Sequence, residues 1–212
     1  MSIQQTISEL EINEVLHFTT NFGLVGIFSL NKLVSRDQLG KEQALEYITR
    51  YNSKFRSDPQ WTSYVNLSLS RINSSFFEYS KSWHQGPYDF WVILAFDPAI
   101  LNHEDVVFTT TNNIYRNECI RGSGNEGLMK LFEPKILAKR GFVKLRPIEF
   151  PRNWTTCEEA EVLYPNEIDL SYLTKLYVPD ENTLALACAA LSFDEKFNEV
   201  TIEVNEDKFK GL

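Results

Sequence analysis

The chain has 212 residues, of which 43% are apolar and 24% charged, and its formal net charge at pH 7 is −8. This composition excludes a disordered chain, and the length fits one folded domain over residues 1–212. No stretch approaches the roughly 18 apolar residues of a membrane span, and residues 1–20 lack the pattern of a secretory leader, so we expect no membrane association and a cytoplasmic location.

The first half of the chain predicts strands that alternate with helices. Strands are predicted at residues 14–20 and 64–70, and helices at 21–30, 41–52 and 74–83. Residues 53–61 contain Asp58-Pro59 and predict a loop.

The second half predicts the centre of a sheet and then its later strands. Residues 90–96 form an apolar run typical of a strand covered on both faces, and residues 106–110, which are β-branched except for Phe108, predict a second strand. Further strands are predicted at 159–164, 173–178 and 200–204, and helices at 124–132 and 180–191, the latter capped by Asp180. Without a Gly-x-Gly-x-x-Gly turn or a phosphate-binding loop, the pattern favours an α+β domain with a mixed sheet over a parallel doubly wound fold.

Metal binding is not indicated by the cysteines and histidines. Three cysteines, odd in number and far apart, argue against a disulfide framework and fit a reducing compartment. Three scattered histidines and no Cys-x-x-Cys provide no tetrahedral ligand spacing, so we expect no metal.

Two carboxylates, Glu159 and Glu161, stand two residues apart on the predicted strand at 159–164. Alternate strand residues point to the same face, so both side chains are expected to project into one cleft. Paired like charges of this kind need a cationic or polyhydroxylated partner. A solvated sheet edge is the alternative.

A basic stretch precedes this pair, although the chain as a whole is acidic. Residues 130–152 contain seven basic residues against Glu133 and Glu149, a local charge of +5. Nucleic-acid affinity comes largely from such Lys and Arg residues. An exposed helix face and strand is the alternative interpretation.

Motifs spread along the chain resemble those of the DarT family. They are His17-Phe18-Thr19 followed by a helix and Leu33-Val34-Ser35-Arg36, a strand ending at Arg71, Phe108-Thr109-Thr110-Thr111-Asn112, and Ala160-Glu161-Val162-Leu163. The resemblance covers roughly residues 12–180. It implies a toxin ADP-ribosyltransferase that modifies a base of single-stranded DNA with NAD⁺ as donor, and a split mixed sheet with the NAD⁺ held in a cleft.

The same resemblance implies roles for individual residues. His17 and Thr19 would bind NAD⁺ from the first strand, with the backbone at Phe18 meeting the nicotinamide amide. Arg71 would act near the cofactor, where its planar fork suits a pyrophosphate or an activated ribose. Glu161 would be the catalytic glutamate, bonding the nicotinamide ribose and stabilising its oxocarbenium ion. A core histidine and a surface ion pair are the alternatives for His17 and Arg71.

Two departures from the family pattern leave the acceptor open. Glu159 stands where many DarT sequences have glutamine, and Leu69-Ser70-Arg71 replaces an Asn-Pro-Arg stretch. Glu-x-Glu also occurs in transferases that modify protein arginine. Guanine offers an amidine-like pair of donors that a carboxylate grips in the same way, so guanine stands beside thymine as the predicted base.

The remaining candidate residues are expected to bind the acceptor. Arg140, Lys144, Arg146 and Arg152 are expected to follow the phosphates of a single strand, while Phe150 or Trp154 stacks on a base. Asn112 is a further candidate for contacting the base or the nicotinamide ribose. Core packing is the alternative for both aromatic residues.

Three functional hypotheses follow in order. The first is a DNA-base ADP-ribosyltransferase toxin, which in this family is neutralised by a macrodomain antitoxin. The second is an enzyme of the same fold that acts on RNA or protein arginine. The third is a catalytically idle module that binds NAD or nucleic acid.

Overall fold

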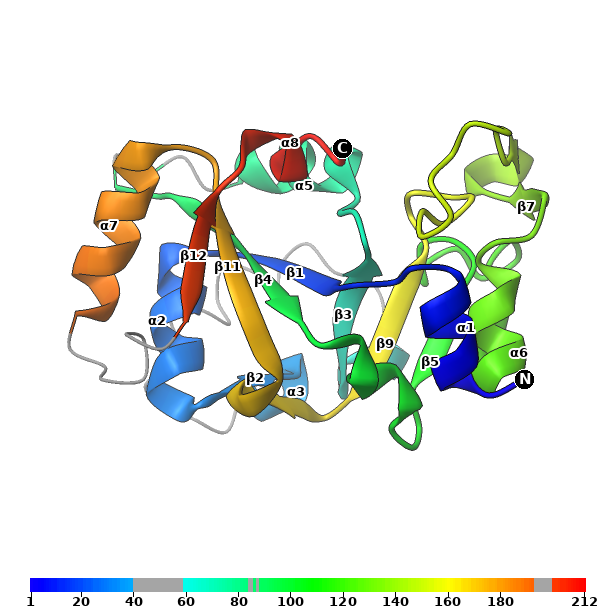
Figure 1. The fold of residues 1–212 in the computed structure, drawn as a ribbon, viewed down its shortest axis with the longest axis horizontal. Helices are drawn as coiled ribbons and strands as arrows, with labels where there is room; N and C mark the ends of the chain where they lie inside the picture. Colours follow the sequence, from blue (N-terminus) through cyan, green and yellow to red (C-terminus); the bar gives the residue numbers. More distant parts are fainter. Residues whose placement is uncertain (40–58, 84–85, 87, 193–199) are drawn as a thin grey trace.

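The computed structural model describes residues 1–39, 59–83, 86, 88–192 and 200–212 (Figure 1). Its strands are β1 (Val15–Thr20), β2 (Lys32–Val34), β3 (Tyr64–Leu69), β4 (Trp91–Phe96), β5 (Val107–Thr109), β6 (Arg121–Ser123), β7 (Lys135–Leu137), β8 (Val143–Leu145), β9 (Glu161–Pro165), β10 (Glu167–Asp169), β11 (Leu173–Val178) and β12 (Thr201–Val204). Its α-helices are α1 (Ile3–Glu9), α2 (Asn21–Leu30), α3 (Arg36–Leu39), α5 (Ser74–Lys81), α6 (Gly124–Lys130), α7 (Glu181–Leu191) and α8 (Glu206–Phe209).

The main sheet has eight strands in the order β12-β11-β4-β1-β3-β9-β5-β6. Within the described ranges its pairs are antiparallel except for β11 with β12, which is parallel. The fold is therefore α+β with a mixed sheet, as the sequence predicts.

This sheet splits between β1 and β3. The two strands pair only at Val15↔Leu69 and Leu16↔Ser68. Beyond that point β1 continues along β4 as far as Thr20, whereas β3 pairs with β9. The ends of β1 and β3 are thus held by different neighbours, and the gap between them positions the site described below.

Apolar side chains pack on both faces of the sheet. The larger core joins α2 and α7 to the alternate residues of the central strands, and the smaller core joins Leu16 and Ile93 to Phe77 of α5 and Phe209 of α8. Strand β4 is buried from Val92 to Phe96, which confirms the prediction of a strand covered on both faces. In Figure 1, α7 lies beside α2 and α8 lies against α5.

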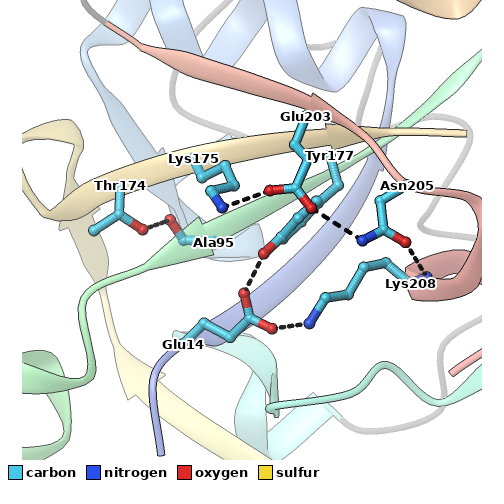
Figure 2. Close-up of polar contacts among 8 residues, drawn as sticks. All are labelled: Glu14, Ala95, Thr174, Lys175, Tyr177, Glu203, Asn205 and Lys208. Carbon is cyan, nitrogen blue, oxygen red and sulfur yellow. Dashed lines mark hydrogen bonds and ion pairs between the residues drawn. The ribbon is translucent and has the colours of Figure 1, made fainter. Parts of the chain in front are cut away.

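A polar network joins the C-terminal segment to the start of β1 (Figure 2). Glu14 accepts a hydrogen bond from the Tyr177 hydroxyl at 2.7 Å and forms an ion pair with Lys208. Glu203 pairs with Lys175 at 2.6 Å and accepts from the side chain of Asn205 at 3.0 Å. Strands β11 and β12 and helix α8 are therefore tied to the segment that leads into β1.

Most predicted elements are confirmed, with one or two residues of difference at their ends. The strand predicted at 159–164 is wrong at its start, because β9 begins at Glu161. Helix α1, the β10–β2 pair and the β7–β8 hairpin were not predicted. The helix predicted at 41–52 and most of the loop at 53–61 lie outside the described residues, and residues 59–61 form a short 3-10 turn.

Candidate active site

A cavity of about 490 Å³ lies at the split in the sheet, within the range of about 300–1,000 Å³ that is typical of small-molecule sites. Strands β1 and β3 form its two sides, and α2, α3 and α5 contribute further wall residues. His17, Phe18, Thr19 and Glu161 all line it. His17 and Glu161, which we predicted from the sequence to belong to one site, therefore share one cavity.

Glu161 stands at the first position of β9, and its two carboxylate oxygens are held by a residue of the neighbouring strand β3 and a residue of the turn that follows β5. The side-chain amide of Asn66 on β3 donates to Oε1 at 3.2 Å, and the backbone N–H of Asn113 donates to Oε2 at 2.8 Å. Charge-assisted bonds of this kind are stronger than neutral ones and fix the orientation of an anion. The carboxylate is thus positioned before any substrate arrives.

His17 is oriented by the same residue that holds Glu161. Its Nδ1 lies 3.0 Å from the backbone oxygen of Asn66. A carbonyl oxygen can only accept, so Nδ1 carries the hydrogen, and in the neutral ring Nε2 is the acceptor. Asn66 therefore joins the two sides of the cavity, through its backbone to β1 and through its side chain to β9.

Thr19 and Phe18 occupy opposite sides of the same strand. A Cβ placed on Gly23 of α2 would lie 2.0 Å from Oγ1 of Thr19, so the helix approaches the strand closely only because position 23 is glycine. The ring of Phe18 packs against Phe77 with centroids 5.3 Å apart. The NAD⁺ roles of His17, Phe18 and Thr19 remain predictions.

Glu159 does not lie on the strand, contrary to the prediction. The backbone N–H of Ala160 bonds to the oxygen of Cys157 at 3.1 Å and closes a turn, so the alternation argument does not apply. The Glu159 carboxylate accepts from the hydroxyls of Thr111 and Tyr115, each at 3.3 Å. It is not among the residues that line the cavity. The two carboxylates consequently lie in different surroundings.

Arg71 also departs from its predicted place, because it does not line the cavity. Its guanidinium lies 4.4 Å from the ring centroid of Trp154 and donates to the backbone oxygen of Thr155 at 3.2 Å. Burial lowers its pKa, an effect that Glu158 opposes. These contacts support a role in holding the loop before β9, and the role at the cofactor stays a prediction.

Arg146 and Trp154 are likewise occupied within this loop. Arg146 donates to the backbone oxygens of Trp154, Pro151 and Arg152, the second at 2.9 Å. Trp154 has Arg71 over its ring and Phe150 at 5.5 Å. In this structure these groups stabilise the loop, and the phosphate and base-stacking roles of Arg146 and Trp154 stay predictions.

Other acceptor candidates remain available on the surface. Arg140 and Lys144 are exposed on the β7–β8 hairpin, and Arg152 is exposed on the following loop, where the roles predicted for them stay predictions. In Figure 1, the β7 segment and the loop before β9 lie at the same end of the molecule. Asn112 caps its own turn by accepting from the N–H of Ile114 at 3.1 Å, and its neighbour Asn113 contacts Glu161.

Several site residues were missed from the sequence. Asn66 and Arg36 line the cavity, and Asn113 and Tyr115 contact the two carboxylates. An asparagine inside a strand is disfavoured by propensity, so Asn66 carried a signal that could have been used. Asn113 acts through its backbone, which no side-chain pattern reveals.

Comparisons with known proteins identify the family. The family model described as "ssDNA thymidine ADP-ribosyltransferase, DarT" matches residues 16–209. The chain belongs to the DarT family. Its DarT match begins one residue before His17 and includes Glu161.

Solved DarT structures share the fold at low sequence identity. Thermus sp. 2.9 DarT in complex with NAD⁺ superimposes with a TM-score of 0.62 at 17% identity, covering 93% of this chain and 98% of that one. Its complex with ADP-ribosylated single-stranded DNA has a TM-score of 0.61 at 15% identity, covering 93% and 96%. Thermosipho africanus DarTG in complex with ADP-ribose has a TM-score of 0.59 at 14% identity, and this chain spans 51% of its length. None of the curated proteins matches the sequence.

The described ranges of the chain contain no group of three or more His, Cys, Asp or Glu residues arranged to hold a metal ion. In the same ranges, no helix combines the length and the apolarity needed to cross a bilayer.

Proposed function

We propose that this chain is a single-domain, NAD-dependent ADP-ribosyltransferase of the toxin type, which transfers ADP-ribose to a thymine base of single-stranded DNA. The observation that carries the proposal is Glu161, a carboxylate held at both oxygens in a cavity that His17 shares, in a chain of the DarT family. The family description favours DNA over RNA or protein arginine, and the held carboxylate is not what an idle module requires.

The cavity suits NAD⁺ in its polar groups as well as in its volume. Ser35 lines it with a buried hydroxyl that has no hydrogen-bond partner among the described residues, so a ligand hydroxyl or phosphate oxygen would satisfy it. Arg36 also lines the cavity and would supply positive charge for a pyrophosphate, whereas Lys32, a further wall residue, is ion-paired with Glu167 at 2.8 Å. In this assignment Arg36 takes the role that the sequence gave to Arg71, and His17 and Thr19 bind from β1.

Glu161 acts on the bond that breaks. NAD⁺ supplies the ADP-ribosyl group and loses nicotinamide, which leaves positive charge on the ribose carbon and ring oxygen. A fixed anion beside that charge lowers the barrier, because it stabilises charge that develops in the transition state and needs no reorientation. Holding the acceptor in line behind the departing group supplies the rest.

Glu159 and the exposed basic residues would bind the DNA that accepts the ADP-ribose. The Glu159 carboxylate, held by the hydroxyls of Thr111 and Tyr115, can accept a hydrogen bond from a base, such as the imide N–H of thymine. Arg140, Lys144 and Arg152 would contact the phosphates of the strand. Oligonucleotides that each contain one kind of base, analysed by mass spectrometry after reaction, identify the modified base. Label on guanine instead of thymine would show that guanine, the other base predicted from Glu159, is the acceptor.

The partner and the place of action complete the proposal. A DarG-like macrodomain antitoxin would reverse the modification, which is consistent with the longer Thermosipho africanus DarTG that was solved with ADP-ribose. Because the proposed substrate of this chain is DNA, we expect it to act in the cytoplasm.

The central experiment compares the wild type with Glu161→Gln. With labelled NAD⁺ and separate samples of single-stranded DNA, duplex DNA, RNA and protein, we expect the wild type to label single-stranded DNA. The variant should lose about 10²–10³-fold in rate, because the amide cannot stabilise the cation. Glu104→Gln, an exposed glutamate, is the matched control and should retain wild-type rates. Label in RNA or protein alone would contradict the proposal, as would bacterial toxicity that survives Glu161→Gln.

A further inference from the structure

Glu161 and Arg121 lie in one row across three strands. Thr109 of β5 is directly opposite Glu161 of β9 on one side and Arg121 of β6 on the other. Directly opposite residues point to the same face of a sheet, and two strand spacings of about 4.8 Å separate the two backbones by roughly 10 Å. Opposite charges therefore stand on one face with room for a residue between them.

Asn113 lies between the two charges and contacts both. Its backbone N–H donates to Oε2 of Glu161 at 2.8 Å. On its other side it accepts from Arg121, through its side-chain oxygen from Nε at 2.8 Å and through its backbone oxygen from a terminal nitrogen at 2.7 Å. With 2% of its surface exposed, Asn113 is enclosed between these partners.

The fork of Arg121 is itself fixed. Its other terminal nitrogen donates to the backbone oxygen of Cys119 at 3.4 Å, and the guanidinium carbon lies 5.4 Å from the ring centroid of Trp61. Arg121 does not line the cavity, so a role in the reaction has to pass through another residue.

We propose that Arg121 is a positioning residue for the reaction, which orients Asn113 so that its N–H holds Oε2 of Glu161. This inference rests on the proposed function. Two bonds to a single residue fix that residue's rotation as well as its position, and a planar guanidinium provides them where an ammonium cannot. Asn113 also keeps the guanidinium away from the carboxylate. Glu161 thereby keeps a fixed direction for its carboxylate.

Arg121→Lys and Arg121→Gln test the proposal. Nicotinamide release from NAD⁺ without DNA reports on Glu161 whatever the acceptor is, and DNA labelling reports on the whole reaction. We expect kcat to fall about 10- to 100-fold in both assays, because a small misplacement of a catalytic group is costly, while the KM for NAD⁺ changes less than about threefold. Arg116→Lys, at an exposed arginine in the loop between β5 and β6, is the matched control and should behave as the wild type.

A double-mutant cycle separates positioning from general damage. If Arg121 acts through Glu161, Arg121→Lys should have little further effect on kcat in the Glu161→Gln protein. An equal fold-loss in both backgrounds would overturn the proposal, as would a rise in KM without a fall in kcat.

A crystal structure of Arg121→Gln provides a readout that does not depend on activity. The Asn113 N–H should no longer be within hydrogen-bond distance of Oε2 of Glu161, and an unchanged contact would overturn the proposal. If the wild type cleaves no NAD⁺, the proposed function fails, while this structure still decides whether Arg121 orients the Asn113 contact.

Discussion

Tyr115 donates its phenolic hydrogen bond to Glu159, the carboxylate that stands two residues before Glu161. Burial and the neighbouring charge of Glu159 raise the pKa of Tyr115 to about 12. The neutral phenol therefore persists well above neutral pH, so Tyr115 stays a donor throughout the range in which the enzyme would work. Glu159 keeps its orientation over that range.

The stability of the protein at high pH should depend on Tyr115. A tyrosine titrates near pH 10 in the unfolded chain, so its raised pKa contributes stability that is complete below about pH 10 and is lost as the pH rises towards 12. We expect Tyr115→Phe to lack this contribution, so its free energy of unfolding should fall less steeply than that of the wild type. Urea unfolding at pH 8, 9, 10 and 11 measures both slopes, and parallel curves would contradict the assignment.

At the scale of elements, β1 runs directly into α2 without a loop. Thr20 ends the strand and caps the helix, accepting from the N–H of Gly23 at 3.4 Å. Thr19, one residue earlier, lines the cavity at the point where Gly23 comes closest. Strand, cap and cavity wall are thus built by one short segment, and a change in the helix reaches the site directly.

Gly23→Ala should weaken NAD⁺ binding as well as stability. The new methyl group must displace the Thr19 side chain, and such overpacking costs about 1–3 kcal/mol. Asp180→Ala removes the cap of α7, where the Asp180 side chain accepts from the N–H of Thr183 at 2.7 Å, and should cost about 1 kcal/mol without altering NAD⁺ affinity. Urea unfolding and NAD⁺ titration of both variants make the comparison. Wild-type affinity in Gly23→Ala would show that Thr19 is not a ligand.

The β7–β8 hairpin is the element that we expect to meet the DNA backbone. A variant with Arg140→Asn and Lys144→Gln removes two exposed charges, and asparagine tolerates the positive φ of 58° at position 140. The slope of log affinity against log salt for single-stranded DNA should fall by about 1.4, which is the release expected for two phosphate contacts. Lys81→Gln, on α5, is the control and should keep the full slope. Fluorescence anisotropy over a range of salt concentrations would detect an unchanged slope, which would remove the hairpin from the interface.

At the scale of the whole molecule, the C-terminal segment contacts the residue that leads into β1. Glu14 precedes β1, and Lys208 and Tyr177 reach it from α8 and β11 (Figure 2). The side chains of Glu14 and Lys208 are only 14% and 20% exposed, so this pair is shielded from water more than the other ion pairs of α8. The strand that carries His17 therefore depends on the C-terminal segment.

Lys208→Met should destabilise the protein by about 1–3 kcal/mol, because it leaves the half-buried Glu14 without its cation. Lys210→Met, on the exposed side of the same segment, should change stability far less, because water screens its ion pairs. The double variant with Glu14→Gln should recover part of the loss. Urea unfolding measures all three, and additive losses would show that the two side chains are not coupled.

Much of the fold and part of the site could be predicted from the sequence. The apolar run of β4, the alternation in β3 and the cap of α7 are local patterns, and each element formed where its pattern predicted it. His17 and Glu161 were found from their motifs. Glu159 was misplaced because one backbone hydrogen bond, from Ala160 to Cys157, closes a turn before the strand and delays its start to Glu161, and local propensity does not encode that bond.

The sequence by itself determined which residues carry charge, which segments form strands or helices, and which family the chain resembles. Only the tertiary structure decided how those charges are used. Arg71 and Arg146 hold a loop, Arg121 holds Asn113, and Asn66 joins His17 to Glu161. The physical reason is that a hydrogen bond depends on where two groups meet in space, and the partners of Arg71, His17 and Glu161 come from segments far apart in the chain.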